Sequence, residues 1–306
     1  MRRSVRADAA QYWPRLADLQ RTLGDFVALT KPAIVSLLVV TAVAGAFLAA
    51  QGVPPAAALT AIVLGGSLAA GGAGALNHYM ERDLDGAMAR TRRRPLPGHR
   101  IPPLQALAFG VALNLLALLV FLALANPLAA GLAMLGSVFY LVVYTRWLKR
   151  TTSQNIVIGG AAGAIPPLVG WAAVTGGLGL PALYLFAIVF FWTPPHFWAL
   201  ALILKDDYAR AGIPMLPVVQ GDRATARQIF LYTLLVIALT VLLFTTGTVG
   251  WLYLAVAVVS GAALLLYSWQ LLRHLGPRQA RRLYMFSLIY LAAVFAAVMI
   301  DSSVLG

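Results

Sequence analysis

Long apolar stretches separated by short charged segments dominate the pattern of this chain. Five stretches contain no Asp, Glu, Lys or Arg, and they cover residues 32–80, 101–145, 151–204, 228–272 and 283–300. A helix needs about 20 mainly apolar residues to cross a membrane, so the first four stretches each accommodate two crossings and the last accommodates one. Turn-forming Gly, Pro or Asn residues lie near the middle of each of the first four. The pattern therefore predicts an all-α integral membrane protein with nine spanning helices.

The composition agrees with a membrane protein. Of the 306 residues, 61% are hydrophobic and 11% are charged, whereas a soluble domain carries about 25% charged residues. This excludes a water-soluble globular enzyme and a disordered protein, and the absence of Cys excludes a disulfide scaffold and a thiolate metal site. The expected helices lie near 33–50, 56–79, 103–125, 128–147, 154–174, 181–204, 228–245, 250–272 and 283–304.

The charged residues indicate the orientation in the membrane. All 23 Lys and Arg residues lie in the first 31 residues or in the loops that a count of nine helices places on the same side. Because basic loops remain in the cytoplasm, the N-terminus is expected inside and the C-terminus outside. The net charge of +13 is then explained by topology and contact with anionic membrane lipid, and no nucleic acid is expected as a partner.

The chain is expected to have a cytoplasmic N-terminal segment, 1–31, followed by a single transmembrane domain, 32–306. Apolar side chains recur at helical spacing in the first segment, which favours a helix lying in the membrane interface rather than a signal peptide. The side chains at this spacing are Trp13, Leu16, Leu19, Leu23 and Phe26.

Acidic residues gather where the second predicted helix leaves the membrane. Asn77, Glu81 and Asp85 are spaced four residues apart, so they share one face of a helix. An amide and two carboxylates are oxygen ligands that Mg²⁺ accepts, with phosphate oxygens completing its shell. A solvated, capped helix end is the alternative reading of this segment.

A second acidic pair, Asp206 and Asp207, follows the sixth predicted helix on the same side of the membrane. Basic residues accompany both acidic segments, and acids for a metal together with bases for an anion suggest a diphosphate. A diphosphate with a long apolar tail would reach such a site from the lipid, which gives the hypothesis of prenyl transfer. The basic residues are Arg90, Arg94, Lys149 and Arg150.

His196 is the only histidine predicted deep within a membrane segment, and such a group is a functional candidate. Its imidazole could contact a haem iron or bond a carbonyl freed by Pro194 and Pro195. Several aromatic rings could face an allylic cation, although packing and interfacial anchoring are the favoured explanation for any single ring. The rings are Tyr140, Tyr144, Trp192, Phe197 and Trp198. Asp301, near the outer end of the last helix, receives no role.

These residues resemble the UbiA-type intramembrane prenyltransferases. The first signature of that family is Asn-x-x-x-Asp-x-x-x-Asp followed by Arg-Thr-x-x-Arg-Pro-Leu, and this chain has Asn77, Glu81 and Asp85 followed by Arg90 to Leu96, with Glu81 in place of Asp. Further segments resemble the branch of the family that attaches a farnesyl group to protohaem IX. They are Leu29 to Pro32, Tyr144 to Thr151, Asn155 to Gly160, Gly163 to Trp171, Trp192 to Leu200 and Asp207 to Pro217.

The resemblance implies a ring of nine helices around a central cavity in the bacterial inner membrane, with the active site facing the cytoplasm. It implies transfer of farnesyl from farnesyl diphosphate to protohaem IX, with Mg²⁺ held by Asn77, Glu81, Asp85, Asp206 and Asp207. The expected substrate-binding residues are Arg90, Arg94, Tyr144, Lys149, Arg150 and His196. An enzyme that oxidises haem O is a possible partner.

Three other functions compete with this one. A prenyltransferase acting on a quinone precursor is the runner-up, and the matches around Trp192 and Ile213 count against it. A transporter would place ionisable groups near the middle of the membrane, where this chain has few. A scaffold for oxidase assembly would not need the acidic segments.

Overall fold

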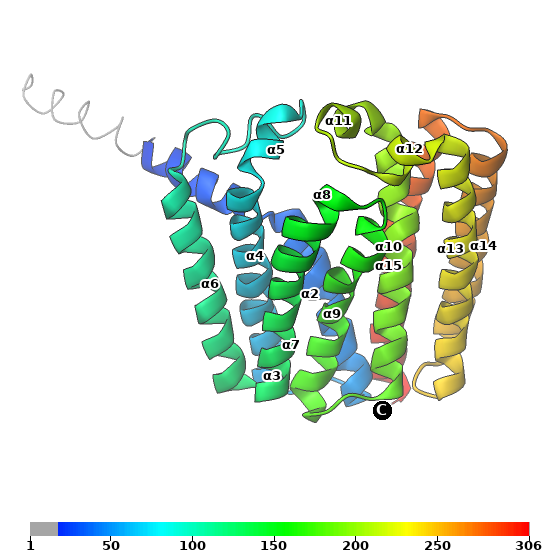
Figure 1. Cartoon of the computed structure of the whole chain (residues 1–306). Helices are drawn as coiled ribbons and strands as arrows, with labels where there is room; N and C mark the ends of the chain where they lie inside the picture. Colours follow the sequence, from blue (N-terminus) through cyan, green and yellow to red (C-terminus); the bar gives the residue numbers. More distant parts are fainter. Residues whose placement is uncertain (1–17, 306) are drawn as a thin grey trace, which may run out of the picture.

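A computed structural model describes residues 18–305, and this part of the chain is helical throughout, without strands (Figure 1). It contains nine helices long and apolar enough to span a membrane, which confirms the predicted number. These spans are Pro32–Ala50, Ala56–Met80, Pro103–Leu124, Pro127–Thr151, Asn155–Thr175, Leu180–Ile203, Gly221–Thr246, Trp251–Arg273 and Pro277–Val304. The chain is therefore an all-α integral membrane protein.

Some spans are built from several helical elements. The elements, in chain order, are α2 (Pro32–Ala50), α3 (Ala56–Thr60), η1 (Ala61–Gly65), α4 (Gly66–Met80), α5 (Arg82–Ala87), α6 (Pro103–Leu124), α7 (Pro127–Val138), η2 (Phe139–Leu148), α8 (Lys149–Thr151), α9 (Asn155–Thr175), α10 (Leu180–Ile203), α11 (Lys205–Arg210), α12 (Leu216–Val219), α13 (Gly221–Leu243), η3 (Phe244–Thr246), α14 (Trp251–Arg273) and α15 (Pro277–Leu305). Two of them, η1 and η2, are π-helical.

The seventh and ninth spans begin earlier than the sequence pattern predicts. They start at Gly221 and Pro277, whereas the predicted helices start at residues 228 and 283. Both extensions carry arginines, such as Arg223 and Arg278, whose side chains are exposed. The charge-free stretch marks the part of a helix that lies in lipid, and it does not mark where the helix itself begins.

Glycine allows the central helices to pack closely. A Cβ on Gly170 of α9 would lie 1.7 Å from the carbonyl oxygen of Ala42 in α2, so the two backbones touch at this point. A Cβ on Gly160 would lie 3.1 Å from Thr193 in α10. Small residues thus hold α9 between α2 and α10, and α9 and α10 are the most buried of the described spans. The last helix, α15, packs against α10 and also against the first span, α2.

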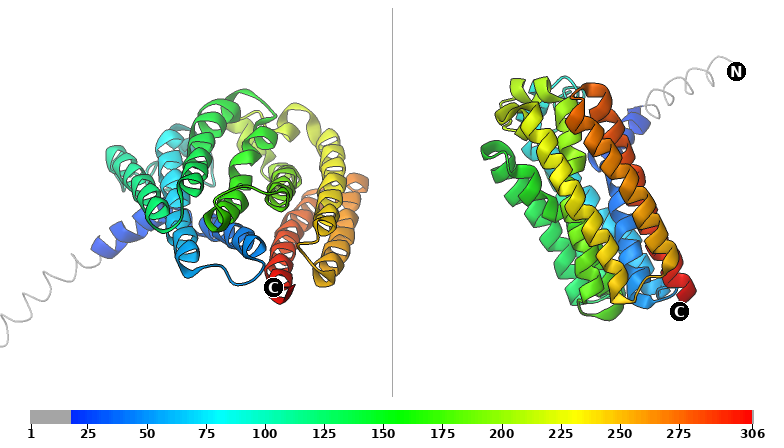
Figure 2. Two further views of the ribbon diagram at one scale, coloured as in Figure 1. Left: turned by 90° about the horizontal axis from the view of Figure 1, so that it is seen from below. Right: turned by 90° about the vertical axis from the view of Figure 1, so that its right-hand side faces the viewer.

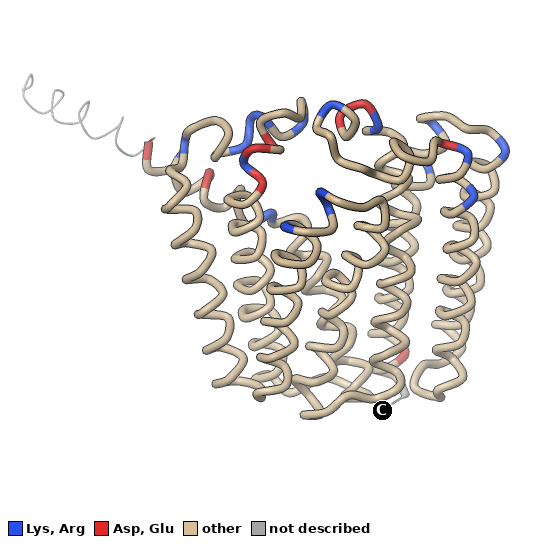
Figure 3. The backbone as a smooth tube through the Cα atoms, viewed as in Figure 1, with Lys and Arg blue, Asp and Glu red and all other residues tan. Residues whose placement is uncertain are grey.

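The Lys, Arg, Asp and Glu residues lie mostly at one end of the bundle, where α5, α11 and α12 are found (Figure 3). Asp301 is an exception: it lies near the C-terminal end of α15 and accepts from the amide of Gly250, just before α14, at the opposite end of that helix from Arg273. A helix over residues 18–29 lies at the charged end and projects away from the bundle (Figure 2). Leu19 and Leu23 on this helix are exposed, and Trp13 and Leu16 of the predicted interfacial helix lie outside the described residues. That the charged end faces the cytoplasm remains a prediction.

Candidate active site

The three residues of the first acidic segment stack at the junction of α4 and α5. The α-helix is interrupted at Glu81, whose φ and ψ are −102° and 10°. The hydrogen bonds between residues four positions apart nevertheless continue across this break. The Glu81 amide donates to the Asn77 carbonyl at 2.9 Å, and the Asp85 amide donates to the Glu81 carbonyl at 2.8 Å. All three side chains are at most 3% exposed. A solvated helix end would leave them in water, so the structure contradicts that alternative.

A basic side chain contacts each of the two buried carboxylates. Lys149 Nζ lies 2.5 Å from Glu81 Oε1, and Arg94 Nη1 lies 2.9 Å from both carboxylate oxygens of Asp85. The Thr91 hydroxyl donates to the Asp85 carbonyl at 2.8 Å, which ties the loop carrying Arg94 to α5. Lys149 and Arg94, which the sequence predicted to bind phosphate, therefore contact Glu81 and Asp85, which it predicted to bind the metal.

Lys31 is a third cation of this cluster. Its Nζ donates to Asn77 Oδ1 at 2.5 Å and to the Tyr140 hydroxyl at 3.3 Å. Burial lowers the pKa of the Lys31 ammonium to about 7, although Glu81 opposes the shift. The backbone of Lys31 has a left-handed φ of 55°, which is uncommon for a residue other than glycine. Strain of this kind gathers at functional sites, so Lys31 belongs to the candidate site.

Glycine in α4 allows Lys31 to reach Asn77. A Cβ on Gly74 would lie 3.0 Å from the Leu29 carbonyl oxygen and 3.1 Å from that of Thr30. Because Gly74 has no side chain, the segment before α2 lies directly against α4. Leu29 to Pro32 is one of the segments that resemble the family, yet the charge pattern explains Lys31 only as one of the residues that set topology. The lysine's contact with Asn77 spans 46 residues, which no local pattern reveals.

The π-helical element η2 supplies another wall of the site. Asn77 Nδ2 donates to Thr145 Oγ1 at 3.0 Å, and Tyr140 stacks on Tyr144 with ring centres 5.7 Å apart. A Cβ on Gly159 of α9 would lie 2.3 Å from Cδ2 of Tyr144, so this glycine makes room for the ring. π-Helical turns are frequent at functional sites, and this one brings two aromatic rings beside the acidic segment.

Two of the predicted substrate-binding residues lie at the rim. Arg90 is exposed, and Arg150 forms two bonds with Asp83, of 2.9 and 3.0 Å. The Arg150 guanidinium lowers the pKa of the Asp83 carboxyl. Asp83 does not share the buried face of Glu81 and Asp85, because its side chain is 59% exposed.

The second acidic segment is less buried than the first. Asp206 is exposed, and Asp207 contacts Arg210 on the same short helix. Tyr208, which follows Asp207 in α11, is buried. Burial raises the pKa of the Tyr208 hydroxyl, while Arg90 lowers this pKa and Glu81 raises it. Tyr208 is therefore close enough to interact electrostatically with the first acidic segment. Among the described residues, no three His, Asp or Glu side chains gather closely enough to hold a metal by themselves. The two acidic segments therefore do not converge into one carboxylate cluster in this conformation.

The donor set of the first segment nevertheless fits Mg²⁺. It offers one amide oxygen and two carboxylates, all buried, with oxygen from a bound phosphate left to complete the coordination. His78 Nδ1 lies 3.8 Å from Asp85 Oδ2 and is enclosed without a hydrogen-bond partner among the described residues, so this corner is not internally satisfied. Asn77, Glu81 and Asp85 are thus the residues that could hold the metal.

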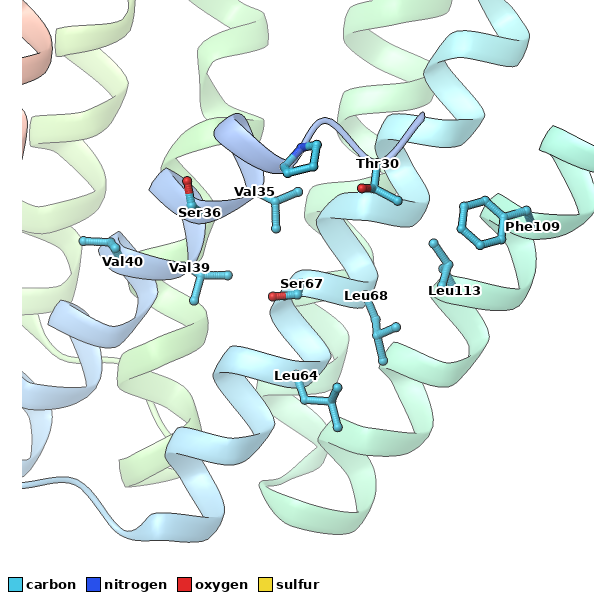
Figure 4. Close-up of a pocket in the computed structure, with 11 residues that line it drawn as sticks. Thr30, Val35, Ser36, Val39, Val40, Leu64, Ser67, Leu68, Phe109 and Leu113 are labelled. Carbon is cyan, nitrogen blue, oxygen red and sulfur yellow. The ribbon is translucent and has the colours of Figure 1, made fainter. Parts of the chain in front are cut away.

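An apolar crevice opens between helices near Lys31, and Figure 4 shows the residues that line it. It runs along α2, α4 and α6, encloses about 550 Å³, and begins at Thr30 and Pro32, on either side of Lys31. Its other lining residues are Val35, Ser36, Val39, Val40, Leu64, Ser67, Leu68, Phe109 and Leu113. Apolar lining of this kind suits a hydrocarbon chain, such as that of a lipid or an isoprenoid.

His196 lies apart from these charges, in α10 against α15. Its Nδ1 is 2.7 Å from the Ser287 hydroxyl oxygen. Of the two alternatives for His196, a bond to a carbonyl freed by Pro194 and Pro195 is not formed by this nitrogen, whose partner comes from another helix.

The chain matches a known family over most of its length. A family model described as the UbiA prenyltransferase family matches residues 38–290. The chain is 55% identical over 279 residues to the protoheme IX farnesyltransferase of Symbiobacterium thermophilum, an alignment that covers 90% of this chain and 93% of that relative. It is 50% identical over 303 residues to the protein of the same name from Gloeobacter violaceus, covering 99% and 98%. Against the longer relative from Roseiflexus sp., at 51% identity, it spans about half, 52%, of that protein.

Solved structures have the same fold. The chain is similar to a digeranylgeranylglyceryl phosphate synthase with a TM-score of 0.78 at 17% identity, covering 92% of this chain and 99% of that one. It is also similar to a UbiA homologue from Archaeoglobus fulgidus bound to DMAPP and Mg²⁺, with a TM-score of 0.68 at 14% identity, covering 90% and 99%. At these identities the similarity concerns the fold, which is UbiA-like.

Proposed function

This chain belongs to the UbiA prenyltransferase family, and on that premise we propose that it transfers a farnesyl group from farnesyl diphosphate to a vinyl group of protohaem IX, giving haem O and diphosphate. It is a prenyltransferase and an integral membrane protein. The identity of 50% over 303 residues with a protoheme IX farnesyltransferase supports the choice of both substrates. The buried cluster of Asn77, Glu81 and Asp85 with three cations is the observation that carries the chemistry.

The metal would be held by Asn77, Glu81 and Asp85. When bound, Mg²⁺ supplies positive charge that stabilises the diphosphate as it leaves. The same cations that now contact the carboxylates, Lys149 and Arg94, are within reach of an anion placed beside them, and they would neutralise phosphate oxygens. Both cations contact the carboxylates through side-chain atoms. Rotation of the Lys149 and Arg94 side chains would therefore move these contacts from carboxylate to phosphate oxygens.

The second acidic segment would form the opposite wall. Asp207 is the better placed of the two predicted ligands, because it is partly buried next to Tyr208, whereas Asp206 is exposed. For Asp207 to reach a shared diphosphate, it must leave Arg210. Arg90 and Arg150 at the rim would attract the anion before it enters.

Aromatic rings would protect the allylic cation that forms when diphosphate leaves. Tyr144 and Tyr140 stack beside the acidic segment and present π faces near it. The surrounding helices limit access of water, which would otherwise convert the cation to farnesol. The basic end of the bundle would face the cytoplasm of a bacterial cell, with the substrates entering from the membrane. An enzyme that oxidises haem O would then receive the product.

A direct assay tests this proposal. Membranes containing the chain, supplied with farnesyl diphosphate, haem and Mg²⁺, should form haem O, identified by mass spectrometry of the extracted pigments. Chelation by EDTA should abolish product formation, and added Mg²⁺ should restore it. Alkylation of a quinone precursor such as 4-hydroxybenzoate, with haem unchanged, would support the alternative prenyltransferase instead.

A further inference from the structure

The ring of His196 is held rigidly in the interior of the bundle. Its side chain lies between the indole of Trp192, with ring centres 4.4 Å apart and planes inclined by 17°, and the ring of Tyr284, at 4.7 Å and 25°. Two stacked neighbours prevent rotation about the Cβ–Cγ bond. Trp192 is itself fixed, because its Nε1 donates to the Ser287 carbonyl at 2.9 Å. The direction of each imidazole nitrogen is therefore set by the packing of α10 against α15.

The hydrogen bonds of Ser287 determine the tautomer of His196. The Ser287 hydroxyl donates its single proton to the Tyr284 carbonyl at 2.7 Å. The same oxygen lies 2.7 Å from His196 Nδ1. Because a hydroxyl has only one proton to donate, both bonds are satisfied only when Nδ1 carries a proton and donates it to Ser287. The neutral form of His196 compatible with these bonds is the Nδ1–H tautomer, in which Nε2 has a free lone pair.

The Nε2 atom is available to a ligand. No described residue forms a hydrogen bond with it, and it is not enclosed, in contrast to the sealed Nδ1 of His78. Histidines that bind metals characteristically donate their other ring N–H to a fixed acceptor, which orients the ring and increases its basicity. His196 has this arrangement, with Ser287 as the acceptor, although no carboxylate or thiolate contacts it to recruit a free metal ion. A metal that reached Nε2 would have to arrive already bound in an apolar ligand.

We propose that His196 Nε2 is the axial ligand to the iron of protohaem IX while that substrate is bound, and that Ser287 is a positioning residue that fixes the ligating tautomer. The inference rests on the proposed function, which supplies an iron porphyrin as substrate. The bond forms when the Nε2 lone pair replaces a water or hydroxide on the iron, and no electron transfer is needed. Coordination by one atom fixes the height of the porphyrin in the membrane while its vinyl edge remains free to react.

Comparison of two porphyrins separates ligation from packing. Purified wild-type chain and the His196→Ala variant are titrated with ferric haem and with iron-free protoporphyrin IX, and binding is followed by the Soret band. Wild type should bind haem with the spectrum of an imidazole-ligated iron. His196→Ala should lose that spectrum and bind haem about tenfold or more weakly, while protoporphyrin IX binds both proteins equally. Added imidazole should restore the ligated spectrum of the variant.

Two further variants complete the test. Ser287→Ala should retain ligation with an affinity lowered several-fold, because either tautomer is then allowed. His274→Ala, which alters an exposed histidine in a loop, should behave as wild type, and thermal unfolding of all variants shows that they are folded.

The possible results separate the two proposals. If His196→Ala binds haem as tightly as wild type and still forms haem O, the ligand assignment is overturned and the proposed function stands. If the variant loses haem and protoporphyrin IX equally, His196 only packs, and the assignment is again overturned. If wild type binds haem through His196 but forms no haem O from farnesyl diphosphate, ligation stands and the proposed transfer fails.

Discussion

Two buried carboxylates, Asp85 in α5 and Asp301 in α15, lie at opposite ends of the bundle and are stabilised by different kinds of partner. Asp85, at the charged end, is 1% exposed and contacts the side chains of Arg94 and, at 3.8 Å, His78. Asp301, at the opposite end, is 7% exposed, and its Oδ2 accepts from the backbone amides of Gly250 and Tyr253, both at 2.8 Å.

The difference between the partners separates function from stability. The amides that Asp301 binds are the first turn of α14, so this side chain caps a helix that is distant in sequence. Backbone amides in a helix cannot be withdrawn, and the bond is part of the fold. Asp85 has a mobile partner, since the Arg94 side chain can turn away and leave the carboxylate to a cation. A buried carboxylate whose partner is another side chain is therefore a better candidate for an active-site acid than one held by backbone amides.

The largest effect is expected for Asp85→Asn, which removes a metal ligand's charge while keeping its shape. Haem O formation should fall about 10²–10³-fold, which corresponds to about 3–4 kcal/mol of transition-state stabilisation. Initial rates measured by chromatography of extracted haems test this. Asp83→Asn is the matched control, because Asp83 also pairs with an arginine but is exposed, and it should retain nearly full activity.

Loss of stability is the competing explanation for an inactive Asp85→Asn protein, since Arg94 would lose its partner. The double variant with Arg94→Gln removes the unpaired cation, so it should recover thermal stability without recovering activity. Recovery of activity in the double variant would show that Asp85 serves only to neutralise Arg94.

The next largest effect is expected for Lys31→Met. This change removes the cation at Asn77 and should lower kcat/KM for farnesyl diphosphate about 10–30-fold, or about 1.4–2 kcal/mol, because the proposed site loses one of its three cations for binding the anion. Lys205→Met is the control, since Lys205 pairs with the half-exposed Asp222 at the same end of the bundle. Equal effects of the two substitutions would mean that Lys31 contributes only to the general positive charge.

The sequence predicted what depends on spacing and composition. The nine spans follow from the apolar stretches, and the shared face of Glu81 and Asp85 follows from helical periodicity, which the structure preserves across the break at Glu81. The contacts of Lys31 and Asp301 could not be predicted, because their partners lie 46 to 109 residues away and are brought together only by tertiary packing. The exposure of Asp206 was equally inaccessible, since α11 has only six residues and is too short to carry a periodic signal.

A smaller effect, on stability alone, is expected at the other end of the molecule. Asp301→Ala leaves two amides at the start of α14 without an acceptor and should cost about 1–2 kcal/mol. For a protein of this size the Tm should fall by about 2–8 °C, measured by tryptophan fluorescence in detergent. Asp301→Asn keeps an oxygen acceptor and should lose less. The rate per folded molecule at low temperature should match wild type, and a lower rate would mean that the two ends are coupled.

The smallest effect is expected for Asp206→Asn. This variant tests whether the distinction between side-chain and backbone partners, drawn for Asp85 and Asp301, also applies to the second acidic segment. Asp206 is exposed and Asp207 contacts Arg210, a side chain that can be withdrawn as Arg94 can. By the reasoning applied to Asp85, Asp207 is the functional acid of the second segment, so Asp207→Asn should lower the rate several-fold. Asp206→Asn should change it less than about twofold, because an exposed charge contributes little. If Asp206→Asn instead abolished haem O formation while Asp207→Asn did not, α11 would have to turn its exposed face inward during the reaction. A side-chain partner in the resting conformation would then no longer identify the carboxylates that take part in catalysis.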